Sequence, residues 1–154
     1  MRALVRLLFV LATLCGVTGC DSYRYETYVA ELDGALEGVT TKARGRAIVL
    51  VSRRGDRAEI ALSVSGVESS ITGSYVRQAP RGQTGRSVYT LWEPGQGAFD
   101  NDSAILRVWE RSGGPGVAAF DDAMLRELRA GNLYVNVLSR ARPSGEVRGQ
   151  LLPE

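Results

Sequence analysis

Hydrophobic and polar residues alternate with a period of two along most of the chain beyond residue 25. Tyr28, Ala30 and Leu32 fall on one face of the first such stretch, which is the pattern of a strand with one buried side. Alternating or β-branched stretches of this kind predict strands at 28–32, 45–52, 57–65, 70–77, 87–92, 104–109, 132–139 and 146–152. Segments rich in turn-forming residues separate these strands, so we expect antiparallel hairpins.

One segment, 121–129, departs from this alternation and predicts a short helix. Asp121 stands where a capping side chain is favoured, and Arg126 and Arg129 lie towards the end, where the helix dipole favours positive charge. Gly131 follows as a left-handed cap. We therefore expect an all-β protein, a single antiparallel β-sandwich of the Ig-like or Greek-key kind, with one short helix before the last hairpin.

The first twenty residues follow a different pattern. Arg2 and Arg6 precede an apolar run at 7–17, which is too short to span a membrane and ends in Val17-Thr18-Gly19-Cys20. This segment resembles the lipobox of bacterial lipoproteins. The resemblance implies that residues 1–19 are a removed signal peptide and that Cys20 carries a diacylglyceryl group and a further acyl chain such as palmitate.

The segment 20–24 is then the lipidated cysteine and its tether, and 25–154 form the domain. Asp21 resembles an inner-membrane retention signal and favours the inner membrane of the cell envelope. The alternative interpretation is an ordinary secretory peptide that leaves Cys20 as a free thiol.

Charge and composition exclude several classes of function. The chain has 19 basic and 17 acidic residues and no histidine. Without Arg2 and Arg6 the mature chain is formally neutral, which gives no support to a nucleic-acid partner. The absence of histidine removes the Ser-His and Cys-His catalytic pairs and every imidazole metal ligand. We expect no enzyme activity, no metal site and no cofactor, and Cys20 alone cannot form an intrachain disulfide after removal of Cys15.

The C-terminal segment carries a dense motif that includes Tyr134-Val135-Asn136-Val137, Gly145-Glu146 and Arg148-Gly149-Gln150-Leu151. It resembles the closing signature of the CHRD domain, first described in chordin, and the resemblance extends over about 25–152. Members usually carry Ala-His-Ile-His before a glycine-rich loop and a histidine after Tyr-Val-Asn-Val. This chain has Gly73-Ser74-Tyr75-Val76-Arg77 in the first region and Leu138-Ser139 in the second. A metal site built from those histidines is therefore not expected here.

The motif residues in question are Tyr134, Asn136, Gly145, Glu146, Arg148, Gly149 and Gln150. One interpretation is a partly buried network around a Glu146–Arg148 pair, because the i, i+2 spacing places both side chains on one face of a strand. A second interpretation is a solvated face with a weak ion pair. A ligand-binding role is the third.

Other candidate sites have simpler explanations. Asp100-Asn101-Asp102 fits a calcium loop for three residues and then fails. Several arginines could recognise an anionic group if the loops brought them together, namely Arg53, Arg54, Arg77, Arg81 and Arg86. Trp92 and Trp109 end strands, where tryptophan is usually part of the core.

These inferences together predict a membrane-anchored, extracytoplasmic, non-catalytic binding module that contacts an envelope protein or an anionic surface polymer. Two alternatives stay open. One is a metal- or redox-linked envelope protein that uses carboxylate ligands, and the other is a purely structural envelope protein.

Overall fold

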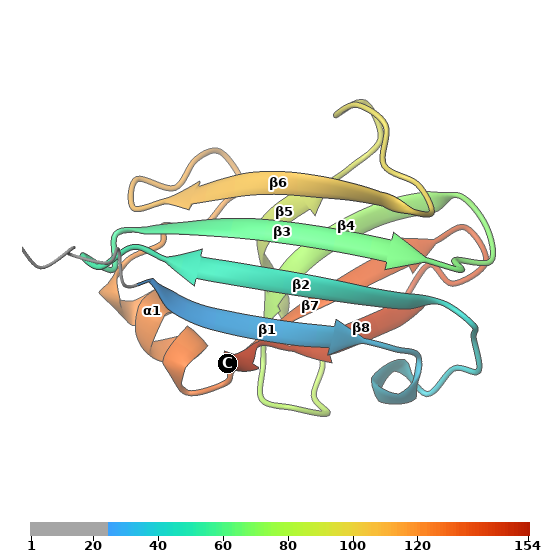
Figure 1. Ribbon diagram of the computed structural model, residues 1–154, viewed down its shortest axis with the longest axis horizontal. Helices are drawn as coiled ribbons and strands as arrows, with labels where there is room; N and C mark the ends of the chain where they lie inside the picture. The colour runs from blue at the N-terminus through green and yellow to red at the C-terminus, as the bar shows by residue number, and fades with distance from the viewer. Residues whose placement is uncertain (1–24) are drawn as a thin grey trace, which may run out of the picture.

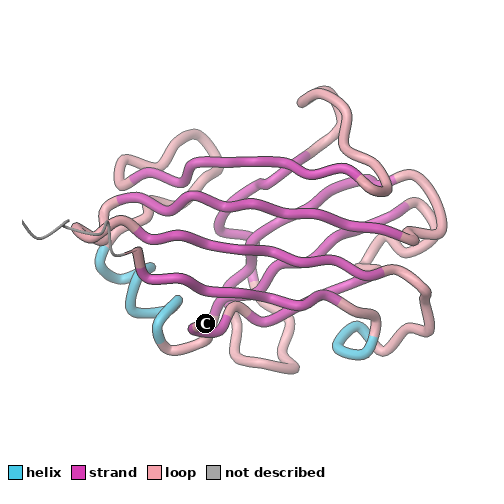
Figure 2. Tube along the Cα trace, viewed as in Figure 1, coloured by secondary structure: helices cyan, strands magenta, loops and turns pink. Residues whose placement is uncertain are grey.

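The computed structural model describes residues 25–154. The expected signal peptide, Cys20, Asp21 and the expected tether lie outside the described residues. Strands are the main regular elements of the described chain and form two antiparallel sheets packed face to face, with helices only at the two ends (Figures 1 and 2). The expected all-β sandwich with one short α-helix before the last hairpin is confirmed.

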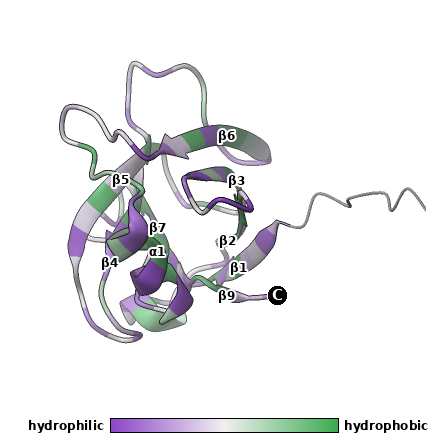
Figure 3. Ribbon diagram, turned by 90° about the vertical axis from the view of Figure 1, so that its left-hand side faces the viewer, coloured by the Kyte–Doolittle hydropathy of each residue, from purple (hydrophilic) through white to green (hydrophobic). Residues whose placement is uncertain are grey.

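The larger sheet has five strands in the order β6-β3-β2-β1-β9. Its strands are β1 (Glu26–Leu32), β2 (Arg44–Val51), β3 (Arg57–Ser65), β6 (Ser103–Glu110) and β9 (Leu152–Pro153). The smaller sheet has the order β5-β4-β7-β8. Its strands are β4 (Ile71–Gln78), β5 (Arg86–Trp92), β7 (Leu133–Ser139) and β8 (Val147–Gln150). Seen edge-on, β4, β5 and β7 form one layer and β1, β2, β3 and β6 the other (Figure 3).

Alternation along the strands builds the core, as the sequence predicts. Tyr28, Ala30 and Leu32 are all buried, and every second residue of β3 is buried with them. In β7, Leu133, Val135 and Val137 join the same core cluster. Burial of these inward faces is the main favourable contribution to folding.

The tryptophans belong to the core. Trp109 stacks on Tyr89 with ring centroids 5.0 Å apart and contacts Phe120 at 5.1 Å. Its indole N–H donates to the Ala118 carbonyl at 2.7 Å. Trp92 is also buried, and its indole N–H donates to the carbonyl of Gly97. Because each indole N–H has a partner inside the chain, neither ring is presented as an external platform.

The α-helix α1 (Asp122–Arg129) begins and ends as the sequence predicts. The Asp121 carboxylate accepts a hydrogen bond from the Met124 amide at 2.9 Å, and Gly131 adopts a φ of 70°. A short 3₁₀ helix, η1 (Ala35–Glu37), lies at the opposite end of the sandwich, where only a turn was expected (Figure 2). The Asp33 side chain accepts a hydrogen bond from the Ala35 amide and starts this turn.

The last expected strand, 146–152, is not one continuous strand. The chain leaves the smaller sheet after Gln150 and joins the larger sheet at Leu152, which pairs with Val29. Between them, Leu151 is buried in the core and its amide donates to the Leu133 carbonyl. One continuous apolar pattern therefore covers two short strands in different sheets.

Candidate functional site

The CHRD-like motif lies mainly on the outer side of the smaller sheet. Asn136 on β7 pairs with Arg148 on β8, and Tyr134 pairs with Gln150. Since the alternate residues of β7 fill the core, these four side chains point the other way. They are nevertheless buried; Arg148, for example, is only 3% exposed. Contacts with the β4–β5 loop and the η1 segment account for this burial.

Arg148 and Tyr134 together hold the β4–β5 loop against the sheet. An Arg148 guanidinium N–H donates to the Gln83 carbonyl at 2.6 Å, and the guanidinium carbon lies 3.5 Å from the centroid of the Tyr134 ring. The Tyr134 hydroxyl accepts a hydrogen bond from the Gly85 amide at 3.1 Å. A stacked guanidinium over a tyrosine ring is a favourable cation–π contact, so this pair stabilises a long connection.

Gln150 ties two further segments to β8. Its side-chain amide donates to the carbonyl of Ala79, where β4 ends, at 3.1 Å. The same nitrogen donates to the carbonyl of Gly131, just after α1, at 2.6 Å. One buried amide group thereby satisfies carbonyls from two loops far apart in the sequence.

Glu146 and Arg148 do not form the ion pair that one of the three interpretations assumed. Glu146 lies before the first residue of β8 and is fully buried. Its carboxylate accepts hydrogen bonds at 2.9 Å from the Thr41 hydroxyl and the Glu68 amide. It therefore joins the segment before β2 to the segment before β4, while Arg148 serves the β4–β5 loop.

The two motif glycines occupy places where a side chain has no room. A Cβ on Gly149 would lie 2.3 Å from the Glu31 carbonyl oxygen, because β1 and β8 approach closely there. The neighbouring backbone of Arg148 exchanges hydrogen bonds with that of Asp33. At Gly145, a Cβ would lie 2.7 Å from the carboxyl carbon of Glu37.

Glu37 brings an acidic group to the edge of this motif. Burial raises the pKa of Glu37 above its ordinary value. The positive charges of Arg148 and Arg77 and the Asn136 amide offset only part of that shift. The motif therefore forms a layer of polar and charged groups in which the arginines and Asn136 offset only part of the cost of burying the Glu37 carboxylate.

The two segments in which the family resemblance places histidines lie beside Asn136 in the smaller sheet. Tyr75 lies opposite Asn136 in the β4–β7 pairing, and Arg77 lies opposite Tyr134. Leu138 follows Asn136 by two residues on the same strand. Here the Tyr75 hydroxyl donates to Glu93 at 2.9 Å, and an Arg77 guanidinium N–H donates to the Gly85 carbonyl at 3.4 Å. Within residues 25–154, no three His, Cys, Asp or Glu side chains gather as a metal site would require.

The other candidate residues from the sequence, the loop arginines and the Asp-Asn-Asp loop, do not form a binding site in the structure. Arg53 and Arg54 lie in the β2–β3 turn. Elsewhere on the molecule, Arg77 lies near the end of β4, Arg81 in the β4–β5 loop and Arg86 at the start of β5 (Figure 1). The five arginines are therefore not brought together. In the Asp-Asn-Asp loop, the Asn101 side chain accepts from the Val67 amide and donates to the Val67 carbonyl.

The outer side of the larger sheet presents a different surface. Cross-strand pairing places Leu152, Val29, Ile48, Ala61 and Leu106 in one line across all five strands, and we call this line the apolar row. Leu106 is 75% exposed and Leu152 44% exposed. Val108, two residues beyond Leu106 on β6, is 42% exposed. An outward sheet face normally carries polar residues, so this row needs an explanation.

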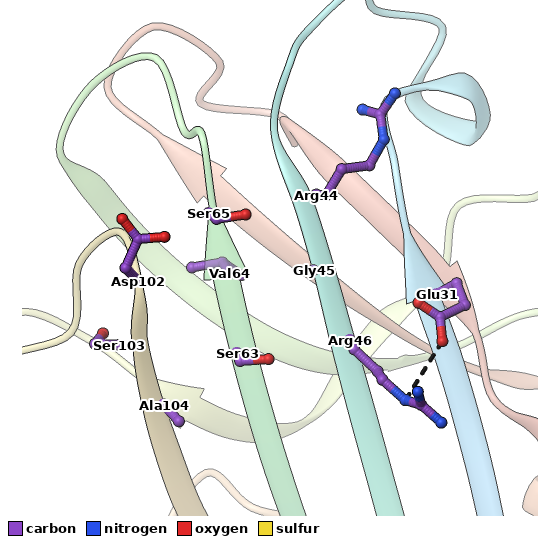
Figure 4. A pocket seen from close by; sticks show the side chains of 10 residues that line it. All are labelled: Glu31, Arg44, Gly45, Arg46, Ser63, Val64, Ser65, Asp102, Ser103 and Ala104. Atoms are coloured by element: carbon purple, nitrogen blue, oxygen red, sulfur yellow. Dashed lines mark ion pairs between the residues drawn. The ribbon is translucent and has the colours of Figure 1, made fainter.

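A polar groove of about 470 Å³ lies beside the apolar row, at the start of β2 and the end of β3 (Figure 4). Arg46 points towards Glu31, with the two charged groups 3.4 Å apart. Arg44 donates to the carbonyls of Ala43 and Thr41. Because both arginines have partners within the chain and the acidic Glu31 and Asp102 also line the groove, it offers no purely positive patch to a polyanion.

The apolar row was missed by the sequence interpretation, although a signal was present. The run Ala47-Ile48-Val49-Leu50-Val51 has no alternation, so β2 must be apolar on both faces. A run of this kind predicts a strand covered on both sides.

Together the fold and the motif define an antiparallel β-sandwich domain whose C-terminal signature holds its own loops in place. The sequence model of the CHRD domain family matches residues 28–151, and the chain belongs to this family. Family membership indicates an extracellular-type binding module. No curated protein and no solved structure matches the chain significantly. Among the described residues, no helix is both long and apolar enough to cross a membrane.

Proposed function

We propose that this protein is a lipid-anchored, extracytoplasmic and non-catalytic interaction module of the bacterial cell envelope. The observation that carries the proposal is the apolar row, which crosses the exposed face of the larger sheet from Leu152 to Leu106. An apolar patch with polar surroundings is typical of a protein–protein contact.

The surroundings of the row support this function. Towards one end of the strands the Arg57–Glu59 ion pair lies 2.8 Å apart, and towards the other end Arg46 pairs with Glu31. All four side chains lie on the outward face with the row. The face therefore has an apolar centre and a charged rim, which is the usual arrangement of an interface.

The proposed anchor keeps this face close to a membrane. Only residues 21–25 separate Cys20 from Glu26, the first residue of β1. A linker of that length reaches about 20 Å when fully extended. Two or more acyl chains on Cys20 would hold the protein stably, because one chain alone binds membranes only marginally.

The anchor is tested by replacing Cys20 with serine in the full-length protein. We expect the variant to leave the membrane fraction after any uncleaved precursor is accounted for, while the wild-type protein stays there. Mass spectrometry of the wild-type N-terminus should find a diacylglyceryl-modified cysteine. An unmodified N-terminus would refute lipid anchoring.

The interaction surface is tested by thiol labelling in intact membranes. Beyond Cys20, which is acylated in this proposal, 25–154 contain no cysteine, so an introduced cysteine is the only reactive thiol. We expect Leu106→Cys to react with a maleimide at least five times more slowly than Thr72→Cys, an exposed position on β4. Equal labelling would show that nothing covers the row.

A further inference from the structure

We propose that the occupant of the apolar row is a second copy of the same chain, joined face to face in a two-fold dimer. This inference rests on the proposed function, because it names the partner of the same surface. The experiment below distinguishes a second copy of the chain from every other occupant of the row.

The charge pattern of the face is self-complementary. One end of the strands carries the Arg57–Glu59 pair and Glu110, which lies opposite Arg57. The other end carries Arg44 and Arg46, and Arg46 pairs with Glu31 and Glu154. A two-fold axis that lies between two facing sheets and runs along the row sets one row against the other. It also sets the Arg57–Glu59 end of each copy, where the anions outnumber the cations, against the end of its partner that carries Arg44 and Arg46.

The same charges argue against a lipid surface as the occupant. Glu31, Glu59, Glu110 and Glu154 accompany the arginines of this face and oppose attraction to anionic lipids. A sheet face also matches a second sheet, because facing sheets pack about 10 Å apart with interdigitated side chains.

The face is large enough for a stable dimer. Four strands of seven to nine residues, spaced about 4.8 Å apart, give a sheet of roughly 19 by 26 Å, to which the two residues of β9 add little. That area corresponds to about 500 Å² on each copy and about 1,000 Å² in total, which is the lower limit for a specific interface. Confinement of both copies to one membrane raises their effective concentration and favours an interface of this size.

Crosslinking of the full-length, membrane-bound protein tests the dimer. Ile48 is the middle residue of the row. It therefore faces Ile48 of the second copy if the two-fold axis runs along the row, and also if the axis runs along the strands. We expect the photocrosslinking residue p-benzoylphenylalanine, incorporated in place of Ile48, to give a product of twice the monomer mass on illumination, at least five-fold above the same residue in place of Thr72. This crosslinker is already in the interface, so no reagent has to enter the covered surface. A second substitution, Leu106→Arg, should lower that yield at least five-fold, whereas Thr72→Arg should not.

Leu106 is largely exposed and Thr72 is exposed, so neither arginine substitution should unfold the domain; equal melting temperatures of the variants would verify this. A dimer yield from the crosslinker at Ile48 no higher than from the crosslinker at Thr72 would overturn the inference, as would a product of any other mass. If Leu106→Cys is still protected from maleimide in that case, the interaction surface stands and only the second copy is refuted. Equal maleimide labelling of Leu106→Cys and Thr72→Cys would refute both.

Discussion

Gln150 offers a sharp test of how the motif supports the fold. Its side-chain nitrogen donates to the carbonyls of Ala79 and Gly131, and the residue is 5% exposed. Gln150→Ala removes both hydrogen bonds. Gln150→Glu keeps the shape of the side chain but replaces the donor by an oxygen that faces two carbonyl oxygens.

The expected losses follow from the two bonds. Each buried hydrogen bond contributes about 0.5–1.5 kcal/mol net, and the two carbonyls that lose their donor add to the loss, so Gln150→Ala should lower the free energy of unfolding by about 2–3 kcal/mol. Gln150→Glu should cost more than Gln150→Ala, because it also buries an unpaired charge. Gln83→Ala is the matched control, since that side chain is exposed in the β4–β5 loop and should change stability by less than about 0.5 kcal/mol.

Urea unfolding of the mature chain with Cys20→Ser measures these differences through the fluorescence of the buried tryptophans. With a slope of about 1.5 kcal/mol per molar urea, Gln150→Ala should shift the midpoint by roughly 1.5–2 M. A shift below about 0.3 M would refute the bracing role of Gln150. So would a Gln150→Glu variant more stable than Gln150→Ala.

Two further predictions concern stability. Gly149→Ala should destabilise the fold by more than about 2 kcal/mol in the same assay, because its Cβ would meet the backbone of β1. Gly114→Ala, where an added Cβ meets nothing within 4 Å, should be nearly neutral, and equal effects would contradict the close approach. The second concerns Glu26, whose pKa is lowered chiefly by its hydrogen bond to Arg129. A lowered pKa in the folded state means that the carboxylate stabilises the fold above its ordinary pKa near 4.5 and that this contribution is lost as the pH falls through the lowered value. Glu26→Gln should therefore lower the free energy of unfolding slightly at pH 7, by less than about 1 kcal/mol for so exposed a pair. This deficit should shrink as the pH is lowered below the ordinary glutamate pKa, and a deficit independent of pH would exclude the charge effect.

The strands and the helix could be predicted because their signals are local. Alternation in β3 and the Asp121 cap each involve residues within one turn or one strand, and the structure places them as expected. The Glu146–Arg148 pair failed because the spacing argument assumed that both residues lie on one regular strand. Glu146 precedes β8, and its partners Thr41 and Glu68 come from segments that only the tertiary fold brings near it.

The apolar row illustrates a different limit. The non-alternating run in β2 indicates two covered faces, but a single strand does not reveal whether its neighbours share the pattern. Only the registers Val29–Ile48, Ile48–Ala61 and Ala61–Leu106 show that the outward apolar residues are aligned. Register depends on turn lengths and core packing across the sheet, so the surface could not be derived before the fold.

The two sheets therefore have different roles. The smaller sheet has its outer side covered by the β4–β5 loop, which Arg148 and Tyr134 hold in place. In the described chain, the larger sheet keeps its apolar row exposed at Leu106 and Leu152. The proposed anchor enters through β1, a strand of that same larger sheet, so the tether and the open face belong together. A tether that reaches only about 20 Å selects partners confined to the same membrane surface, and a second anchored copy meets that condition without any further component.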